Sequence, residues 1–306
     1  MKRDLIAISE LKIEELEHIF SLTEELKAKV KDSSQGLAGK SLGLIFLKPS
    51  LRTRVSFEVG MNQLGGHVIY LAPEDIKFGT REAIKDFGNV LSRYLDGLVI
   101  RTFSHQQLEE LTASTAIPVI NGLTDLLHPC QALSDLYTIK EKKGALKGVK
   151  IVYVGDGNNV ANSLLSGCAK LGLNLTVTTP AARQPNQKIF TQCLELAKGS
   201  GAQLTLSNDP AQAAKDADIL YTDVWTSMGQ ESDYKKRRKD FCGFQINEKL
   251  TSVAKPDCLI MHCLPAHRGE EITDQVIDGP NSVVMDQAEN RMHVQKAILL
   301  LLLGGV

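Results

Sequence analysis

The sequence of 306 residues lacks the features that mark several large classes of protein. Its six cysteines are scattered and form no Cys-X-X-Cys pair, which argues against a disulfide framework or a zinc ribbon and indicates reduced thiols. The formal net charge is −1, so no general attraction to nucleic acid or to a membrane is expected. The longest apolar stretch, 297–303, is far shorter than the roughly 20 residues that a membrane span needs.

The first twelve residues, MKRDLIAISELK, also lack the long apolar run of a signal peptide. Together with the reduced thiols, this predicts a cytoplasmic protein. Any anion-binding site must be local, because the overall charge offers no attraction.

Short apolar runs alternate with helical patterns along almost the whole chain. This alternation predicts two doubly wound α/β domains, each with a central parallel sheet flanked by helices. The polar segment 144–148 separates domain 1–143 from domain 144–286, and a C-terminal helix over 287–306 packs back on the first domain. The strands are expected at 41–47, 67–71, 97–101, 117–121, 149–155, 173–179, 202–207, 217–225, 257–263 and 282–286.

Ligands of parallel sheets bind at the carboxyl ends of the strands, so the residues that follow each strand are the candidates for chemistry. After the first strand come Ser50, Leu51, Arg52 and Thr53, where a helix begins. Free N–H groups, two hydroxyls and a guanidinium at this point would make a phosphate cradle. The structural alternative is a capping serine beside solvated arginines.

Two further strands of this half end near hydrogen-bond donors. Arg101 closes the third strand, and His128 and Gln131 follow the fourth. Each could be an ordinary surface or helix-start residue. Three strand ends that supply donors to one edge favour a site where negative charge develops, as in acyl transfer.

The second half opens with GDGNN at 155–159, which resembles a dinucleotide-binding turn. Val160 occupies the third glycine position, and no acidic residue stands at the usual ribose position near 175–179. A nucleotide site is therefore weakly supported, and a dehydrogenase is kept as an alternative. Two asparagines at a helix start suit a small ligand.

Two later strand ends carry Asp223 and the run His262-Cys263. Asp223 could pair with a cationic ligand or cap a helix. Cys263 could be a nucleophile if a base lay beside it, but contact with a substrate is the milder interpretation. Adjacent residues at a strand end face opposite ways, so a zinc site is not predicted.

Taken in order, SLRTR, HPCQ, GDGNN, DVWTSMGQE, HCLPAHRG and QAENR resemble the signatures of the ornithine carbamoyltransferases. The resemblance implies transfer of the carbamoyl group from carbamoyl phosphate to L-ornithine, giving citrulline and phosphate. It also implies a carbamoyl phosphate domain, an ornithine domain and a homotrimer or a multiple of trimers. No cofactor or metal is implied.

The resemblance assigns roles to individual residues. Arg101, His128, Asp223 and Cys263 would be catalytic. The carbamoyl phosphate site would consist of Ser50, Leu51, Arg52, Thr53, Arg101, His128, Gln131, Cys263, Leu264 and Arg291. The ornithine site would consist of Asn159, Asp223, Ser227 and Met228.

The chain departs from the family pattern in two places. Leu51 replaces a hydroxyl residue, and little loss is expected because the main contribution there is a backbone N–H. Phe87 and Gly88 replace a Thr-Ala pair after the 73–81 loop, so no role is assigned to Lys77.

The strand-end residues of the second half also indicate which amine accepts the carbamoyl group. Asp223 beside an asparagine pair repels a dicarboxylate and attracts an ammonium, which favours ornithine over aspartate. Putrescine and N-acetylornithine stay open, and so does a catalytically silent binding protein. Neither a biosynthetic nor a catabolic role can be read from the sequence.

Overall fold

The structure is a computed structural model that describes residues 2–28 and 35–305. Its contacts divide the chain into two compact units, Met1–Ser134 with Asn290–Val306 and Asp135–Glu289. The division falls within helices α6 (Pro129–Lys143) and α13 (Val284–Leu299), whereas the sequence placed it at 143 and 286.

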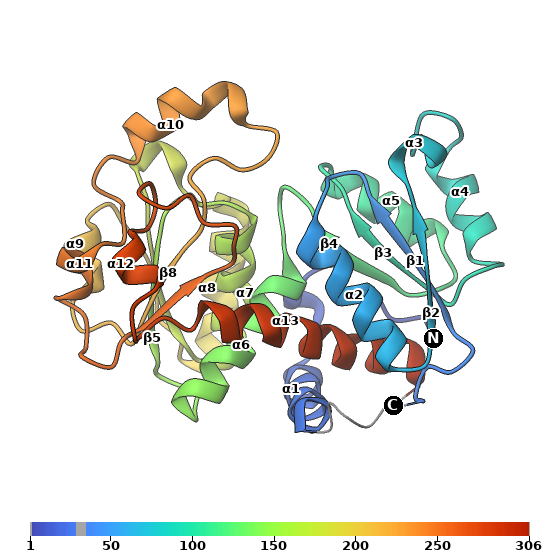
Figure 1. The fold of residues 1–306 in the computed structure, drawn as a ribbon, viewed down its shortest axis with the longest axis horizontal. Helices are drawn as coiled ribbons and strands as arrows, with labels where there is room; N and C mark the ends of the chain where they lie inside the picture. Colours follow the sequence, from blue (N-terminus) through green and yellow to red (C-terminus); the bar gives the residue numbers. More distant parts are fainter. Residues whose placement is uncertain (1, 29–34, 306) are drawn as a thin grey trace. The chain divides into compact units, whose positions relative to one another are not determined.

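The first unit contains a parallel four-stranded sheet with the order β2-β1-β3-β4 (Figure 1). Its strands are β1 (Ser41–Phe46), β2 (His67–Leu71), β3 (Gly97–Arg101) and β4 (Val119–Leu123). Its helices are α1 (Ile13–Ala28), α2 (Leu51–Gln63), α3 (Pro73–Ile76), α4 (Ile84–Leu91) and α5 (His105–Ser114). Strands β3 and β4 are buried along their whole length, as expected for a parallel sheet covered on both faces.

The second unit contains a parallel five-stranded sheet with the order β7-β6-β5-β8-β9. Its strands are β5 (Lys150–Val154), β6 (Asn174–Thr178), β7 (Leu204–Ser207), β8 (Ile219–Thr222) and β9 (Leu259–His262). Its helices are α7 (Asn159–Leu171), α8 (Gln187–Ser200), α9 (Pro210–Ala214), α10 (Tyr234–Asp240), α11 (Glu248–Thr251) and α12 (Asp274–Ile277).

The prediction of two doubly wound α/β domains is confirmed, and nine of the ten expected strands are present. The prediction of a tenth strand at 282–286 is wrong. Ser282 forms a single bridge with Ile260, and helix α13 already begins at Val284 and ends in a π-helical turn over Leu300–Gly304. A short apolar run does not distinguish a strand from the start of a buried helix.

Both sheets have a point where the strand order reverses, between β1 and β3 in the first unit and between β5 and β8 in the second. Ligands of doubly wound sheets bind at these points. The side chains that follow these four strands are therefore the first place to look for a site. Among the helices of residues 2–28 and 35–305, none has both the length and the apolar character needed to cross a membrane.

Candidate functional site

The loop after β1 leads directly into the N-terminus of α2. Ser50 caps this helix, since its Oγ accepts a hydrogen bond from the Thr53 N–H at 3.3 Å and donates one to the Thr53 Oγ1 at 2.9 Å. Leu51 is 76% exposed, so its side chain is not what holds the turn in place. The positive end of the helix dipole and its free N–H groups lie here, which suits an anion.

Thr53 is fully buried and joins this helix start to α13. The Arg291 guanidinium donates a hydrogen bond to the Thr53 hydroxyl, and Arg291 is itself only 5% exposed. Arg101 ends β3, and its carbonyl accepts from the Leu47 N–H at 2.8 Å, which ties the ends of β1 and β3 together. Two buried arginines and a buried hydroxyl thus belong to one edge of the first unit.

His128 lies among these cations, just before α6. Its burial lowers its pKa well below the usual range, and the positive charges of Arg291, Arg101 and Lys48 lower it further. The imidazole is therefore neutral at physiological pH and can donate or accept a hydrogen bond without adding charge. We call Lys48, Arg101, His128 and Arg291 the cation cluster.

Lys48 is the member of this cluster that the sequence analysis missed. Its side chain is almost fully buried, its Nζ lies 2.9 Å from the Asp125 Oδ1, and the same atom sits 5.0 Å from the centre of the Phe103 ring. Lysine is almost never fully buried unless its ammonium group is paired. Its position two residues after a buried strand is the sequence feature that could have identified Lys48 as a site residue.

The other residues predicted for this edge are placed differently. Gln131 is buried in the first turn of α6. Arg52 lies on the exposed side of α2, and its side chain makes no hydrogen bond or ion pair with any residue that the structure describes. Its charge is uncompensated, whereas the neighbouring Arg54 is engaged by Glu58 at 2.8 Å and by the ring of Tyr70.

The GDGNN turn of the second unit allows two backbone segments to pack closely and caps a helix. A Cβ on Gly157 would lie 2.2 Å from the Pro185 nitrogen, so only glycine allows this close approach of two backbone segments. Asn158 caps α7 by accepting from the Val160 and Ala161 N–H groups. The glycines therefore give no support to a nucleotide site, and the weak dinucleotide resemblance is accounted for by packing.

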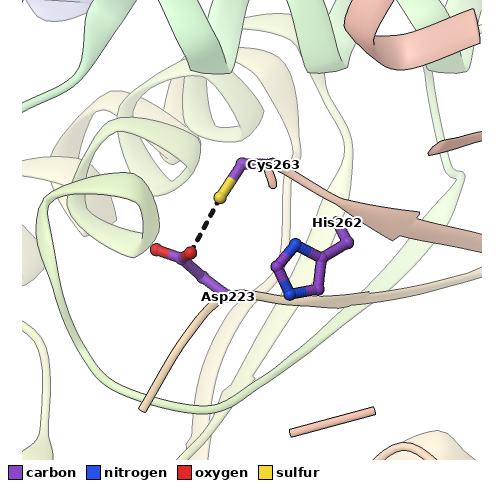
Figure 2. A group of neighbouring side chains, drawn as sticks. All are labelled: Asp223, His262 and Cys263. Atoms are coloured by element: carbon purple, nitrogen blue, oxygen red, sulfur yellow. Dashed lines mark hydrogen bonds between the residues drawn. The ribbon is translucent and has the colours of Figure 1, made fainter. Parts of the chain in front are cut away.

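Asn158 also holds the carboxylate at the end of β8. Its Nδ2 donates to the Asp223 Oδ2 at 2.7 Å, and the Val224 N–H donates to the Asp223 Oδ1 at 2.8 Å. The Cys263 thiol donates to the same Oδ1 at 2.8 Å, as Figure 2 shows. We call Asn158, Asp223 and Cys263 the Asp223 cluster. The sequence analysis named Asn159, and it missed the direct contact of Asn158.

Figure 2 also shows His262 beside this cluster, and one ligand atom from each of Asp223, His262 and Cys263 lies within 4.8 Å of the others. Both ring nitrogens of His262 are already engaged, by the Leu264 N–H at 2.8 Å and by the Glu271 Oε1 at 3.0 Å. The imidazole thus has no lone pair directed at the cluster. The donor set does not fit a resident metal.

A second buried acid lies near Asp223 but is neutralised. Asp156 forms an ion pair with Arg237 at 2.9 Å, and the same guanidinium nitrogen donates to the Trp225 carbonyl at 2.8 Å. Burial raises the pKa of Asp156, and the Arg237 charge opposes that rise. Asp223, by contrast, receives the neutral donors named above and forms no ion pair within residues 2–28 and 35–305, so it can accept a cation.

Four more predicted site residues lie in this unit. Asn159 is the buried first residue of α7, and Leu264 follows Cys263 with a left-handed φ of 54°. Ser227 is half-buried, with its N–H 3.3 Å from the Gln230 Oε1, and Met228 is 43% exposed. Ser227 and Met228 thus stand in a loop that leaves them accessible to a ligand.

The cation cluster fits a small dianion and the Asp223 cluster fits a small cation, as in an enzyme that joins two oppositely charged small molecules. The carbamoyl-P binding domain of the aspartate/ornithine carbamoyltransferases matches residues 3–141, and their Asp/Orn binding domain matches residues 147–302. The chain belongs to the aspartate/ornithine carbamoyltransferase family.

Similar proteins cover the chain from end to end. An ornithine carbamoyltransferase of Thermococcus kodakarensis is 53% identical over 306 residues, which are 99% of this chain and 97% of that protein. The solved ornithine carbamoyltransferase of Pyrococcus furiosus is 52% identical with a TM-score of 0.97, covering 99% of this chain and 98% of that one. The anabolic enzyme of Campylobacter jejuni is 36% identical with a TM-score of 0.93, covering 99% of each chain.

Proposed function

We propose that this protein is an ornithine carbamoyltransferase, which transfers the carbamoyl group of carbamoyl phosphate to the side-chain amine of L-ornithine and releases L-citrulline and phosphate. The observation that carries the proposal is the pairing of opposite chemistries at the two strand-order reversals. Cations gather at the first, and one carboxylate held by neutral donors stands at the second.

On the donor side, Ser50, Arg52, Thr53 and the N–H groups of α2 hold the phosphate, with Leu51 contributing only its backbone. Arg101, His128, Gln131 and Arg291 hold the carbamoyl group, and Cys263 and Leu264 are assigned to the same substrate. The buried hydroxyl of Thr53 and the neutral, buried imidazole of His128 support this assignment.

The donor is already activated, so the reaction needs positioning and charge stabilisation. The neutral amine attacks the carbamoyl carbon, and a tetrahedral intermediate forms with negative charge on the former carbonyl oxygen. Its collapse breaks the carbon–oxygen bond to the phosphate, and the departing phosphate takes up the proton that the amine loses. Arg101, Thr53 and His128 donate hydrogen bonds to that oxygen, and the cations stabilise the departing phosphate. Removing one such donor typically costs on the order of 100-fold in rate or more.

On the acceptor side, Asp223 binds the α-ammonium group of ornithine, and Asn159, Ser227 and Met228 complete the contacts. The attacking amine must be neutral, so activity should rise toward alkaline pH. Aspartate as acceptor would need cations here, and the buried Arg237 is already paired with Asp156. N-Acetylornithine lacks the free α-ammonium that pairs with Asp223. Putrescine keeps a second ammonium but lacks the carboxylate of ornithine, so it makes fewer contacts.

The deciding experiment measures citrulline formation with ornithine, and carbamoyl transfer to putrescine, N-acetylornithine and aspartate in parallel assays. We expect ornithine to be preferred over N-acetylornithine and aspartate by at least about 100-fold in kcat/KM, since one buried charge pair is worth several kcal/mol. The preference over putrescine should be smaller, because putrescine keeps a second ammonium. Preference for putrescine or N-acetylornithine would overturn the acceptor assignment and leave the carbamoyltransferase assignment in place.

The proposal also covers the location, the metabolic role and the assembly of the protein. We infer a cytoplasmic protein in arginine metabolism, and the name "anabolic" carried by a relative from Pyrococcus furiosus that is 52% identical favours biosynthesis. We also infer a homotrimer or a multiple of trimers. An exposed apolar stripe on α2, formed by Leu51, Val55 and Val59, supports self-association.

The assembly is tested by light scattering on the eluting protein. We expect a mass of three chains, or a multiple of three. Replacing Val55 and Val59 with glutamate should lower the mass if α2 lies in the interface, whereas an unchanged trimer would move the interface elsewhere.

A further inference from the structure

The sequence analysis gave no role to His262, the last residue of β9. It is 1% exposed, and its side chain makes two specific hydrogen bonds. Nδ1 lies 2.8 Å from the Leu264 backbone nitrogen, and Nε2 lies 3.0 Å from the Glu271 Oε1. Glu271 is fully buried, and its Oε1 also accepts from the His267 N–H at 2.5 Å.

These partners fix the tautomer of the imidazole. A backbone N–H can only donate, so Nδ1 must be the acceptor and carry no proton. Nε2 then carries the single proton and donates it to the Glu271 carboxylate. A ring flipped by 180° about its Cβ–Cγ bond would place carbon atoms at both partners, so this orientation alone satisfies them.

The bond from Nδ1 acts on a residue with unusual backbone geometry. Leu264 has a φ of 54°, in the left-handed region that leucine seldom adopts. Such a conformation persists only when its surroundings determine it. The hydrogen bond from its N–H to His262, together with partial packing of its side chain against the core of the second unit, supplies that support.

The backbone of His262 is anchored as firmly as its side chain. Its N–H donates to the Gln287 Oε1 at 2.9 Å, and the Gln287 Nε2 donates to the Asp135 Oδ1 at 2.7 Å. The Tyr221 hydroxyl donates to the other oxygen of Asp135 at 2.8 Å. All four residues are buried, so β9 and the start of α13 hold His262 in a rigid frame.

We propose that His262 is a positioning residue for the transfer reaction. It holds the Leu264 backbone in its left-handed conformation through Nδ1, and Glu271 holds the imidazole through Nε2. This inference rests on the proposed function, because Leu264 and Cys263 matter to the reaction only if they contact the carbamoyl group or the amine. His262 itself does not touch either substrate.

A matched pair of variants separates the two hydrogen bonds. In His262→Asn the side-chain oxygen can replace Nδ1 as the acceptor for Leu264, and the contact with Glu271 is lost. In His262→Gln the amide can replace Nε2 as the donor to Glu271, and the contact with Leu264 is lost. Both variants remove the same ring and should lower the melting temperature to a similar extent.

We expect His262→Gln to lower kcat about 100-fold with a change of less than about threefold in the KM for ornithine, since a misplacement of 1 Å can cost that much. His262→Asn should keep at least ten times the kcat of His262→Gln. Equal losses of kcat in the two variants would contradict the proposal, because a purely structural role would not distinguish them.

The tautomer can be tested on the unmodified protein. Long-range 1H–15N spectra should show His262 as the Nε2–H form at pH 7.5, with its signal identified by its disappearance in His262→Asn. A proton on Nδ1 would overturn the proposal whatever the variants do. If the unmodified protein makes no citrulline, the proposed function fails, whereas an active enzyme with equal variants refutes only the role of His262.

Discussion

The candidate residues of both units follow the strands of a parallel sheet, but the buried charges near them have opposite signs in the two units. In the first unit the charges of Lys48, Arg101 and Arg291 lie around a neutral histidine, and Lys48 is paired with Asp125. In the second unit two acids lie close together, and the Arg237 guanidinium neutralises one of them. In both units the parallel sheet supplies the location, and the buried charges found there differ between the units, which suits ligands of opposite charge.

The largest effect should come from reducing the positive charge of the first unit. Arg101→Met removes a buried donor from the cation cluster, and we expect kcat/KM for carbamoyl phosphate to fall about 1,000-fold, at the upper end of the range for such a donor. Steady-state kinetics at saturating ornithine measure it. Arg93→Ala is the control, because Arg93 is exposed in the same unit and should change kcat/KM by less than twofold.

The corresponding change in the second unit is Asp223→Asn. It keeps the shape and removes the charge that would hold the ornithine ammonium. We expect the KM for ornithine to rise about 100-fold, as for the loss of one buried charge pair, with the binding of carbamoyl phosphate changed by less than threefold. Calorimetry with carbamoyl phosphate and steady-state kinetics with ornithine measure the two effects. Asp233→Asn, at an exposed position, is the control.

The pairing of Asp156 with Arg237 can be broken separately. Arg237→Met leaves a buried carboxylate without its cation and should destabilise the second unit by about 3–5 kcal/mol. The double variant Asp156→Asn/Arg237→Met removes both charges and should recover most of the stability, measured by calorimetric melting. No recovery in the double variant would mean that the pair is not coupled.

His128 offers the smallest and most specific test. Its folded pKa is lowered, so below about pH 6.5 the unfolded chain takes up a proton that the folded protein does not. The stability of the first unit should therefore fall as pH decreases through this range, by up to about 1.4 kcal/mol per pH unit from this group. His128→Asn should have a correspondingly shallower slope in urea unfolding between pH 5 and pH 7. Identical slopes would show that His128 protonates normally in the fold.

The sequence predicted the alternating strands well because buried parallel strands form continuous apolar runs between turn residues. It placed Arg101 and His128 after strands of the first unit and Asp223 after a strand of the second, since topology brings the carboxyl ends of parallel strands to one edge of each sheet. It failed at Arg237, which lies in the run YKKRRKD and looks like its solvated neighbours. Only the fold shows that the middle residue of that run turns inward to Asp156.

The roles of Lys48 and His262 also could not be predicted from the sequence. Each lies next to residues that the family resemblance did single out, but neither has a pattern of its own. Lys48 becomes interesting only because its ammonium is buried beside Asp125 and Phe103. His262 becomes interesting only because both of its nitrogens have partners. Hydrogen bonds between residues distant in the chain cannot be read from spacing.

The most direct test is a crossed kinetic comparison of Arg101→Met and Asp223→Asn, with citrulline measured over a full grid of both substrate concentrations. If charge pairing in each unit selects its own ligand, the arginine variant will chiefly lose carbamoyl phosphate and the aspartate variant will chiefly lose ornithine. Two variants that weaken both substrates by the same factor would contradict this division.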